Sequence, residues 1–139
     1  MTGKGRIVAL DVGKKRIGVA VSDELGMIAR PHSTLLRGKT ALDRIRALTA
    51  ELGVRLIVVG LPLRLDGSEG EQAADARRFS EKLQSAAFPT EVILWDERLT
   101  TVEAQERRAQ SGRRKQKHDI DAMAAAVILE SYLGRNEGR

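Results

Sequence analysis

Three short, uninterrupted apolar runs restrict the possible folds of this 139-residue sequence more than any other feature. They occupy residues 7–10, 56–59 and 92–95, and are made mainly of Val, Ile, Leu and Ala. Runs of this length are too short for ordinary helices and are typical of strands that are covered on both faces. The sequence therefore predicts a layered fold in which helices cover a largely buried sheet.

Helical periodicity fills the two intervals between these runs. Apolar residues recur every three or four positions, at Leu42, Ile45, Leu48 and Leu52 and again at Ala76, Phe79, Leu83 and Ala86. Gly53 predicts the end of the first helix and Pro89 limits the second. Strands joined by such helices run parallel, so the three runs are expected to be neighbouring parallel strands.

Two further strands are predicted between residue 12 and the first helix. Ile17, Val19 and Val21 alternate with small residues, and residues 12–15 form a turn, so this strand pairs with the first run as a hairpin. A third, weaker strand is expected near residues 27–35. The fold class is α/β, a mixed five-stranded sheet with three antiparallel strands, then parallel crossovers, and helices on both faces, in a single domain over residues 1–139.

Two helices are predicted after the last strand. Thr100 and Glu103 have the spacing of a capping box, and the helix that they start is expected to end at Gly112. The final helix covers residues 119–133 and is rich in alanine in its first half. These small side chains would let the helix approach the sheet closely.

Acidic residues follow two of the buried runs. Asp11 comes directly after residues 7–10, and Glu97 follows residues 92–95 within Asp96-Glu97-Arg98. Because the carboxyl ends of parallel strands form one edge of a sheet, Asp11 and Glu97 can converge there. Structural alternatives exist: Asp11 could cap a turn, and Asp96 competes with Glu97, since Arg98 could pair with either.

A third acid, Asp121, lies in the first turn of the predicted final helix. Its alternative role is a favourable interaction with the helix dipole, which Asp119 could also supply as the N-cap. Three carboxylates at one site would repel one another, and a divalent cation relieves that repulsion. Mg²⁺ prefers oxygen ligands and is commonly shared between carboxylates and phosphate. Asp11, Glu97 and Asp121 therefore predict an Mg²⁺ or Mn²⁺ site suited to phosphodiester hydrolysis.

The net charge of +5 is concentrated in one segment. Residues 105–118 contain six Lys or Arg residues and one acid, while the rest of the chain is balanced. Such a segment indicates a polyanionic partner, although a solvated loop has the same composition. No apolar run approaches the roughly 20 residues that cross a bilayer. Together with the absence of cysteine, this predicts a cytoplasmic protein with no membrane partner.

Four separated blocks of the sequence resemble the YqgF family of the ribonuclease H-like superfamily, whose members are described as Holliday junction resolvases or pre-16S rRNA nucleases. The blocks span most of the chain, from residue 7 to about 133, and lie at residues 9–20, 59–67, 96–101 and 119–132. This resemblance implies a ribonuclease H-like fold, with Asp11, Glu97 and Asp121 as the metal-binding catalytic acids. Asp119 is a candidate for a fourth carboxylate.

The resemblance also implies hydrolysis of structured RNA, with pre-16S rRNA processing in ribosome biogenesis as the expected role. RNA is favoured over DNA as the substrate. The alternatives are a Holliday junction DNA resolvase and, in another class, a non-catalytic nucleic-acid-binding ribosome assembly factor. The chain is expected to act as a monomer or a homodimer. The residues expected to contact substrate are Lys14, Lys15, Arg16, Arg64, Arg98, Thr100, Arg113, Arg114, Lys115 and Lys117.

Some of these positions have structural alternatives. Lys14, Lys15 and Arg16 could simply form a solvated turn near Asp11. Thr100 is best explained as a helix cap.

Overall fold

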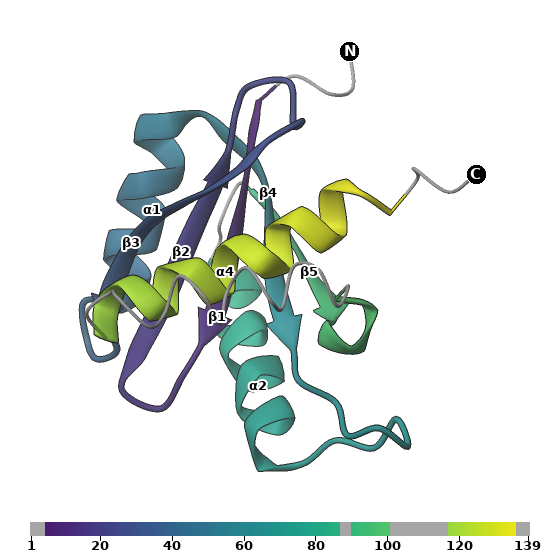
Figure 1. Cartoon of the computed structure of the whole chain (residues 1–139). Helices are drawn as coiled ribbons and strands as arrows, with labels where there is room; N and C mark the ends of the chain where they lie inside the picture. Colours follow the sequence, from purple (N-terminus) through teal and green to yellow (C-terminus); the bar gives the residue numbers. More distant parts are fainter. Residues whose placement is uncertain (1–4, 87–89, 101–116, 136–139) are drawn as a thin grey trace.

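The computed structural model describes residues 5–86, 90–100 and 117–135, with the side chains of the last segment described from residue 120 onward. Its elements follow one another along the chain as shown in Figure 1. They are β1 Arg6–Val12, β2 Arg16–Ser22, β3 Ala29–Leu36, α1 Ala41–Leu52, β4 Val54–Leu61, α2 Glu71–Ser85, β5 Glu91–Asp96, the 3₁₀ helix η1 Glu97–Leu99, and α4 Lys117–Leu133.

The five strands form one mixed sheet in the order β3-β2-β1-β4-β5. β1 lies at its centre and pairs antiparallel with β2, which in turn pairs antiparallel with β3. On its other side β1 pairs parallel with β4, and β4 pairs parallel with β5. The predicted sheet of three antiparallel strands followed by parallel crossovers is confirmed.

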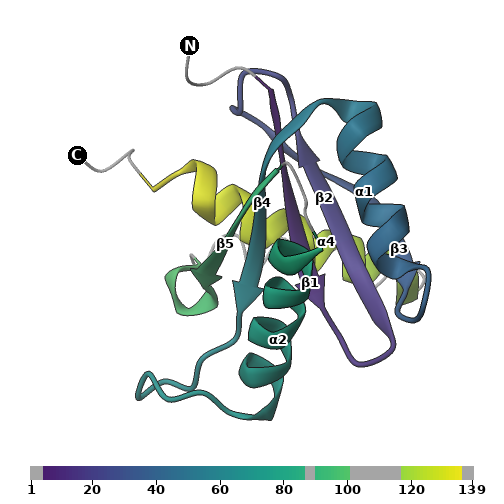
Figure 2. The same ribbon diagram turned by 180° about the vertical axis from the view of Figure 1, so that it is seen from behind.

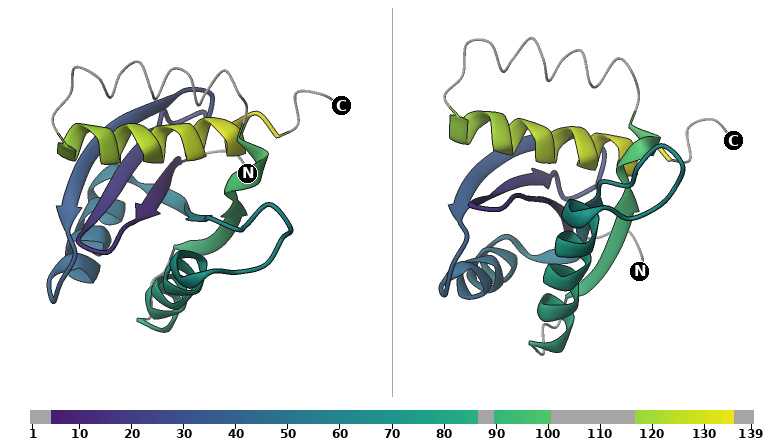
Figure 3. Two further views of the ribbon diagram at one scale, coloured as in Figure 1. Left: turned by 60° about the horizontal axis from the view of Figure 1, so that its bottom comes forward. Right: turned by 90° about the horizontal axis from the view of Figure 1, so that it is seen from below.

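Helices cover both faces of the sheet, as the sequence predicts. Figure 3 shows α4 on one face and α1 and α2 on the other. Seen from behind in Figure 2, α1 and α2 lie in front of the strands. This arrangement buries both faces of the central strands, which explains why β1 and β4 are apolar runs rather than alternating ones. β5 is an edge strand, and only Val92 of its apolar run is buried.

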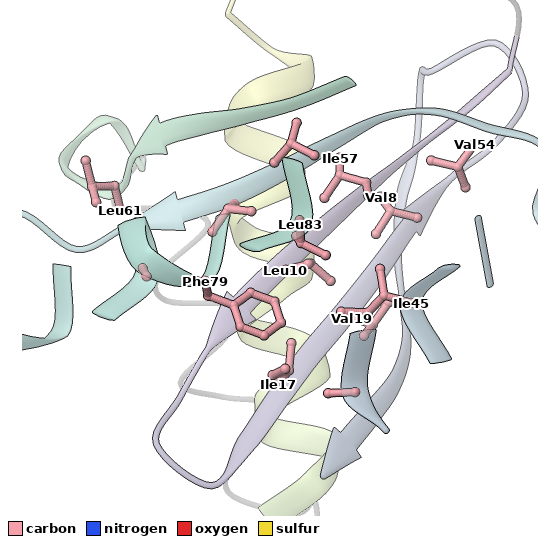
Figure 4. Packing of buried hydrophobic residues seen from close by; sticks show 14 of the residues in the cluster. Val8, Leu10, Ile17, Val19, Ile45, Val54, Ile57, Leu61, Phe79 and Leu83 are labelled. Atoms are coloured by element: carbon pink, nitrogen blue, oxygen red, sulfur yellow. The ribbon is translucent and has the colours of Figure 1, made fainter. Parts of the chain in front are cut away.

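Successive residues of the strands pack alternately in two separate hydrophobic cores, one on each face of the sheet. On the side of α1 and α2, Val8, Leu10 and Ile57 of the sheet share one core with Ile45 of α1 and Leu83 of α2 (Figure 4). On the opposite side, the sheet contributes mainly small or branched residues to a core with α4. Its fully buried members are Ala9, Ala20, Val58, Ala125 and Leu129. Alanine on both surfaces lets α4 lie close to the sheet.

The structure corrects two element boundaries, supplies the start of α2, and leaves one prediction untested. β3 begins at Ala29, not Met27, because the amides of Met27 and Ile28 donate hydrogen bonds to the Asp23 carboxylate in the preceding turn. α2 begins five residues before Ala76. α4 begins at Lys117, which places Asp119 inside the helix and Asp121 in its second turn. The predicted helix from Thr100 to Gly112 lies almost wholly outside the described residues.

None of the helices in the described part of the chain is both long enough and apolar enough to cross a membrane.

Candidate functional site

Asp11 is the second-last residue of the central strand and lies opposite Gly18 of β2. Side chains alternate along a strand, and Ile7 and Ala9 pack in the α4-side core. Asp11 and Gly18 therefore belong to the row of the sheet that faces α4. This row ends at the carboxyl end of the parallel strands, where ligands bind in open α/β sheets.

Gly18 allows the main chain of α4 to touch the sheet next to Asp11. A Cβ atom built on Gly18 would overlap the carbonyl oxygen and carbon of Asp121 and come within 3.1 Å of the Ala122 amide nitrogen. Only glycine fits there, because backbone atoms cannot rotate aside as a side chain does. The third predicted acid is thereby brought beside the strand pair that carries Asp11.

Gly60, on the other side of β1, makes room for the side chain of Glu97. It lies on β4 opposite Trp95 of β5, and a Cβ built on it would lie 2.7 Å from Oε2 and 3.2 Å from Cδ of Glu97. The Glu97 carboxylate thus lies over β4, the strand that separates β5 from β1. The absence of a side chain at residue 60 is what makes room for it.

Asp11 and Glu97 line the same cleft, which has a volume of 470 Å³. Its walls come from the β1–β2 turn, from Pro62 after β4, and from α2. The lining residues of the turn and of α2 include Gly13, Lys14, Glu71, Gln72, Asp75 and Arg78. The predicted convergence of these two acids at one edge of the sheet is therefore observed.

Asp121 lies nearby but its carboxylate points elsewhere. Its Oδ2 accepts a hydrogen bond of 2.9 Å from Nε of Arg16, and the residue does not line the cleft. Across the described residues, no three His, Cys, Asp or Glu side chains are grouped closely enough to hold a metal ion. The structure thus brings the three acids to one region without joining them in a single ligand set.

The neighbouring acid Asp96 has a partner of its own. Arg98 donates hydrogen bonds to both carboxylate oxygens of Asp96, the shortest being 2.7 Å from Nη2 to Oδ2. These bonds lower the pKa of Asp96 below its ordinary value and raise that of Arg98. Asp96 therefore holds Arg98 in place, whereas Glu97 faces the cleft.

The other predicted substrate contacts have diverse surroundings. Lys14 lines the cleft, Lys15 is exposed, and Arg64 donates a hydrogen bond to Ser68 in the β4–α2 loop. The amide of Thr100 donates to the Glu97 carbonyl, so this residue closes η1. Arg113, Arg114 and Lys115, and the side chain of Lys117, lie outside the described residues.

Sequence reasoning missed Arg37 and Asp75. Arg37 follows β3, donates to the Gly13 carbonyl at 2.9 Å, and binds both carboxylate oxygens of Asp75, one of them at 2.8 Å. Its guanidinium also lies over the Phe79 ring, 5.4 Å from the centroid. Arg37 thus ties the β1–β2 turn to α2 across the cleft wall. No local pattern marks this pair, because its members are 38 residues apart.

The pair makes stability depend on pH in a definite direction. The hydrogen bond from Arg37, and then the charges of Arg37 and Arg78, lower the pKa of Asp75 below 3.8. A carboxyl group with a lowered folded-state pKa stabilises the fold above its unfolded pKa, and this contribution disappears as the pH falls through the folded value. Replacing Asp75 with Asn should cost about 1 kcal/mol at pH 7.

That cost should shrink steadily below about pH 5. Urea denaturation at pH 7 and at acid pH measures it. Glu24→Gln, which removes an exposed carboxylate from the β2–β3 turn, is the control and should show no comparable change. A cost that stayed constant with pH would contradict the assigned role of the ion pair.

Replacing Gly60 with Ala should damage the site more than the fold. The new methyl group would lie 2.6 Å from Cδ1 of Ile128 and 2.7 Å from Oε2 of Glu97, and both are the flexible ends of side chains. Their displacement should cost no more than about 1–2 kcal/mol. Moving a reacting carboxylate by about 1 Å can slow a reaction by about 100-fold, so any activity that uses Glu97 should fall by about 10- to 100-fold.

Gly38→Ala is the matched control for Gly60→Ala. It adds the same methyl group where nothing lies within 4 Å and the φ angle is not positive. Cleavage rates together with urea denaturation separate the two effects. Equal rates for both variants would show that the position of Glu97 does not matter.

The sheet order β3-β2-β1-β4-β5, with helices on both faces, gives this protein a RuvC-like fold. RuvC of Thermus thermophilus in complex with a Holliday junction substrate has this fold, with a TM-score of 0.59 at 14% identity and coverage of 96% of both chains. The structure of RuvC from the same species alone gives a TM-score of 0.50 at 16% identity, again over 96% of both chains. At these identities the likeness concerns the fold alone.

Sequence comparison identifies the family. The profile of the RuvX family, described as Holliday junction resolvase, matches residues 5–135, and the chain belongs to this family. A relative from Geobacillus kaustophilus, named "Putative pre-16S rRNA nuclease", is 46% identical over 134 residues, covering 92% of this chain and 96% of the relative. A relative of the same name from Syntrophus aciditrophicus is 47% identical over 132 residues, covering 92% and 87%.

Proposed function

We propose that this protein is a nuclease that hydrolyses phosphodiester bonds in structured RNA and acts on the precursor of 16S rRNA in ribosome biogenesis. The observation that carries the proposal is the convergence of Asp11 and Glu97 on one cleft with Lys14 at its wall. Carboxylates beside a cation suit a site that handles phosphate and a hydrolytic water. Relatives at 46% and 47% identity over nearly the whole chain carry the pre-16S rRNA nuclease name.

The residues present suit a divalent metal ion in their chemistry. Asp11 and Glu97 offer only oxygen atoms, which Mg²⁺ and Mn²⁺ prefer, and Gly60 leaves space for the Glu97 carboxylate beside β1. Asp11, Glu97 and Asp121 would hold the ion. When bound, it would supply activation of water and neutralisation of charge on the phosphate. Lys14 would hold an adjacent phosphate of the strand being cut.

Cleavage of a DNA four-way junction is the second candidate. It is favoured by the family description and by the fold likeness to RuvC bound to a junction. Contacts to phosphates do not distinguish RNA from DNA, whereas contacts to the 2′-hydroxyl do. Symmetric cutting of a junction also requires two active sites, so a resolvase would act as a homodimer. Light scattering of the protein with and without the junction tests this.

The deciding experiment compares both substrates under the same conditions. Purified protein is incubated with an RNA carrying the unprocessed ends of 16S rRNA, and separately with a four-way DNA junction. Each reaction contains Mg²⁺, Mn²⁺ or EDTA. We expect cleavage of the RNA with either metal and none with EDTA. Cleavage of the junction alone would favour the resolvase, and binding without cleavage of either substrate would favour an assembly factor.

A further inference from the structure

The carboxylate of Asp121 is held by Arg16 on the sheet surface. Nε of Arg16 donates to Oδ2 at 2.9 Å, and the two side chains are 27% and 28% exposed. Arg16 lies two residues before Gly18 on β2, and thus on the same face of the sheet. Because the Asp121 carbonyl lies against Gly18, the short side chain of Asp121 reaches Arg16 along β2.

This contact turns Asp121 away from the other two acids. Glu97 lies over Gly60, on the far side of β1 from Gly18, and Asp11 lies between them. Asp11 and Glu97 line the cleft, and Asp121 does not. Arg16 is the one partner that the described residues give the Asp121 carboxylate. Among the described residues, a single arginine therefore holds this carboxylate.

Arg16 is also placed to meet a substrate phosphate. It follows directly after Lys14 and Lys15, and Lys14 lines the cleft. A guanidinium that binds one carboxylate can bind a phosphate with the same planar geometry, often through two parallel hydrogen bonds. Exchanging a partly exposed carboxylate for a phosphate keeps the arginine paired with an anion, so the exchange costs little.

We propose that Arg16 is a positioning residue that makes completion of the acidic site depend on substrate. In the free protein it holds Asp121 apart from Asp11 and Glu97. When a phosphate of the nucleic acid takes over the hydrogen bonds of Arg16, the Asp121 carboxylate is released toward Asp11. This inference rests on the proposed function, since it takes Asp121 to be the third acid of a nuclease site.

The first test measures binding of Mn²⁺ alone, without nucleic acid, by the loss of the free-ion EPR signal. Removal of the arginine in Arg16→Gln should tighten Mn²⁺ binding by about five-fold, the factor that a favourable surface ion pair represents. Removing a positive charge would by itself tighten Mn²⁺ binding to some extent, whether or not the ion pair matters. The same substitution is therefore made in an Asp121→Asn background, where the ion pair no longer exists.

The proposal expects the gain to be largely lost in the Asp121→Asn background. An equal gain in both backgrounds would mean that Arg16 acts only through its charge, and would overturn the proposal. Weaker Mn²⁺ binding by Arg16→Gln would also overturn it, because Arg16 would then orient Asp121 as a ligand. Arg44→Gln, an exposed arginine of α1, is the control and should leave Mn²⁺ binding unchanged.

The second test follows the Nε–H proton of Arg16 by NMR, independently of metal and of cleavage. The proton should exchange slowly with water in the wild type and quickly in Asp121→Asn. Adding a short RNA hairpin in EDTA should shift this signal while keeping the proton protected. A hairpin that binds without moving the signal would overturn the inference but leave the proposed nuclease standing. If neither the hairpin nor Mn²⁺ binds, the proposed function fails and the inference fails with it.

Discussion

Replacing Asp11 with Asn should slow cleavage by at least about 1,000-fold while leaving nucleic-acid binding intact. The amide has the same shape but lacks the negative charge, and stabilisation of a phosphoryl transition state by a metal ion is worth several kcal/mol, each 1.36 kcal/mol being a factor of ten. Binding should be equal or slightly tighter, because one negative charge fewer then faces the phosphates. Single-turnover cleavage and fluorescence anisotropy in EDTA measure the two quantities.

Asp43→Asn is the matched control. It makes the same chemical change on an exposed residue of α1 that does not line the cleft, and it should cleave at the wild-type rate. Retention of more than about a tenth of the activity in Asp11→Asn would remove Asp11 from the mechanism. In cells, a nuclease is expected to lose its function with this substitution, whereas a non-catalytic assembly factor would keep it.

Replacing Gly18 with Val should destabilise the fold strongly, by about 3 kcal/mol or more. A Cβ atom alone would overlap the Asp121 carbonyl, and branching adds two more carbons. The obstacle is main chain, so the first turns of α4 must move away from β2. That shift would open the core around Ala20, Ala125 and Leu129.

Urea denaturation of Gly18→Val measures this loss, with Gly38→Ala as a control at a glycine that has nothing within 4 Å. The activity lost per folded molecule should also be large, because Asp121 moves with the helix. A stability within about 1 kcal/mol of wild type would mean that α4 does not press on β2 as the structure shows. In that case the position of Asp121 would need another explanation.

The fold was predictable because local patterns and global structure agree. The three apolar runs match β1, β4 and β5, and the turn at residues 12–15 joins β1 to β2. Helix α1 ends just before Gly53, whose φ is +64°. The boundary of β3 was not predictable from hydrophobicity. Met27 and Ile28 are apolar, but Asp23 binds their amides in a turn and leaves both side chains exposed.

The sequence predicts that Asp11 and Glu97 share one edge of the sheet, but not how the side chains around them pair. Strand ends predict Asp11 and Glu97 at one edge of the sheet, and both residues line one cleft there. Which acid Arg98 pairs with depends on side-chain reach, and the structure shows it to be Asp96. The contact of Arg16 with Asp121 joins residues 105 positions apart, and that of Arg37 with Asp75 joins residues 38 positions apart. No local sequence pattern predicts contacts at such separations.

The two glycines on either side of Asp11 have a consequence for how such a protein can diverge. At Gly18 the main chain of α4 contacts the sheet directly, and at Gly60 an empty side-chain position makes room for Glu97. We therefore expect that core residues can be exchanged for others of similar volume without changing the spacing of the acids. A library that randomises apolar positions while keeping both glycines should yield many variants that differ in heat resistance and few that differ in turnover per folded molecule.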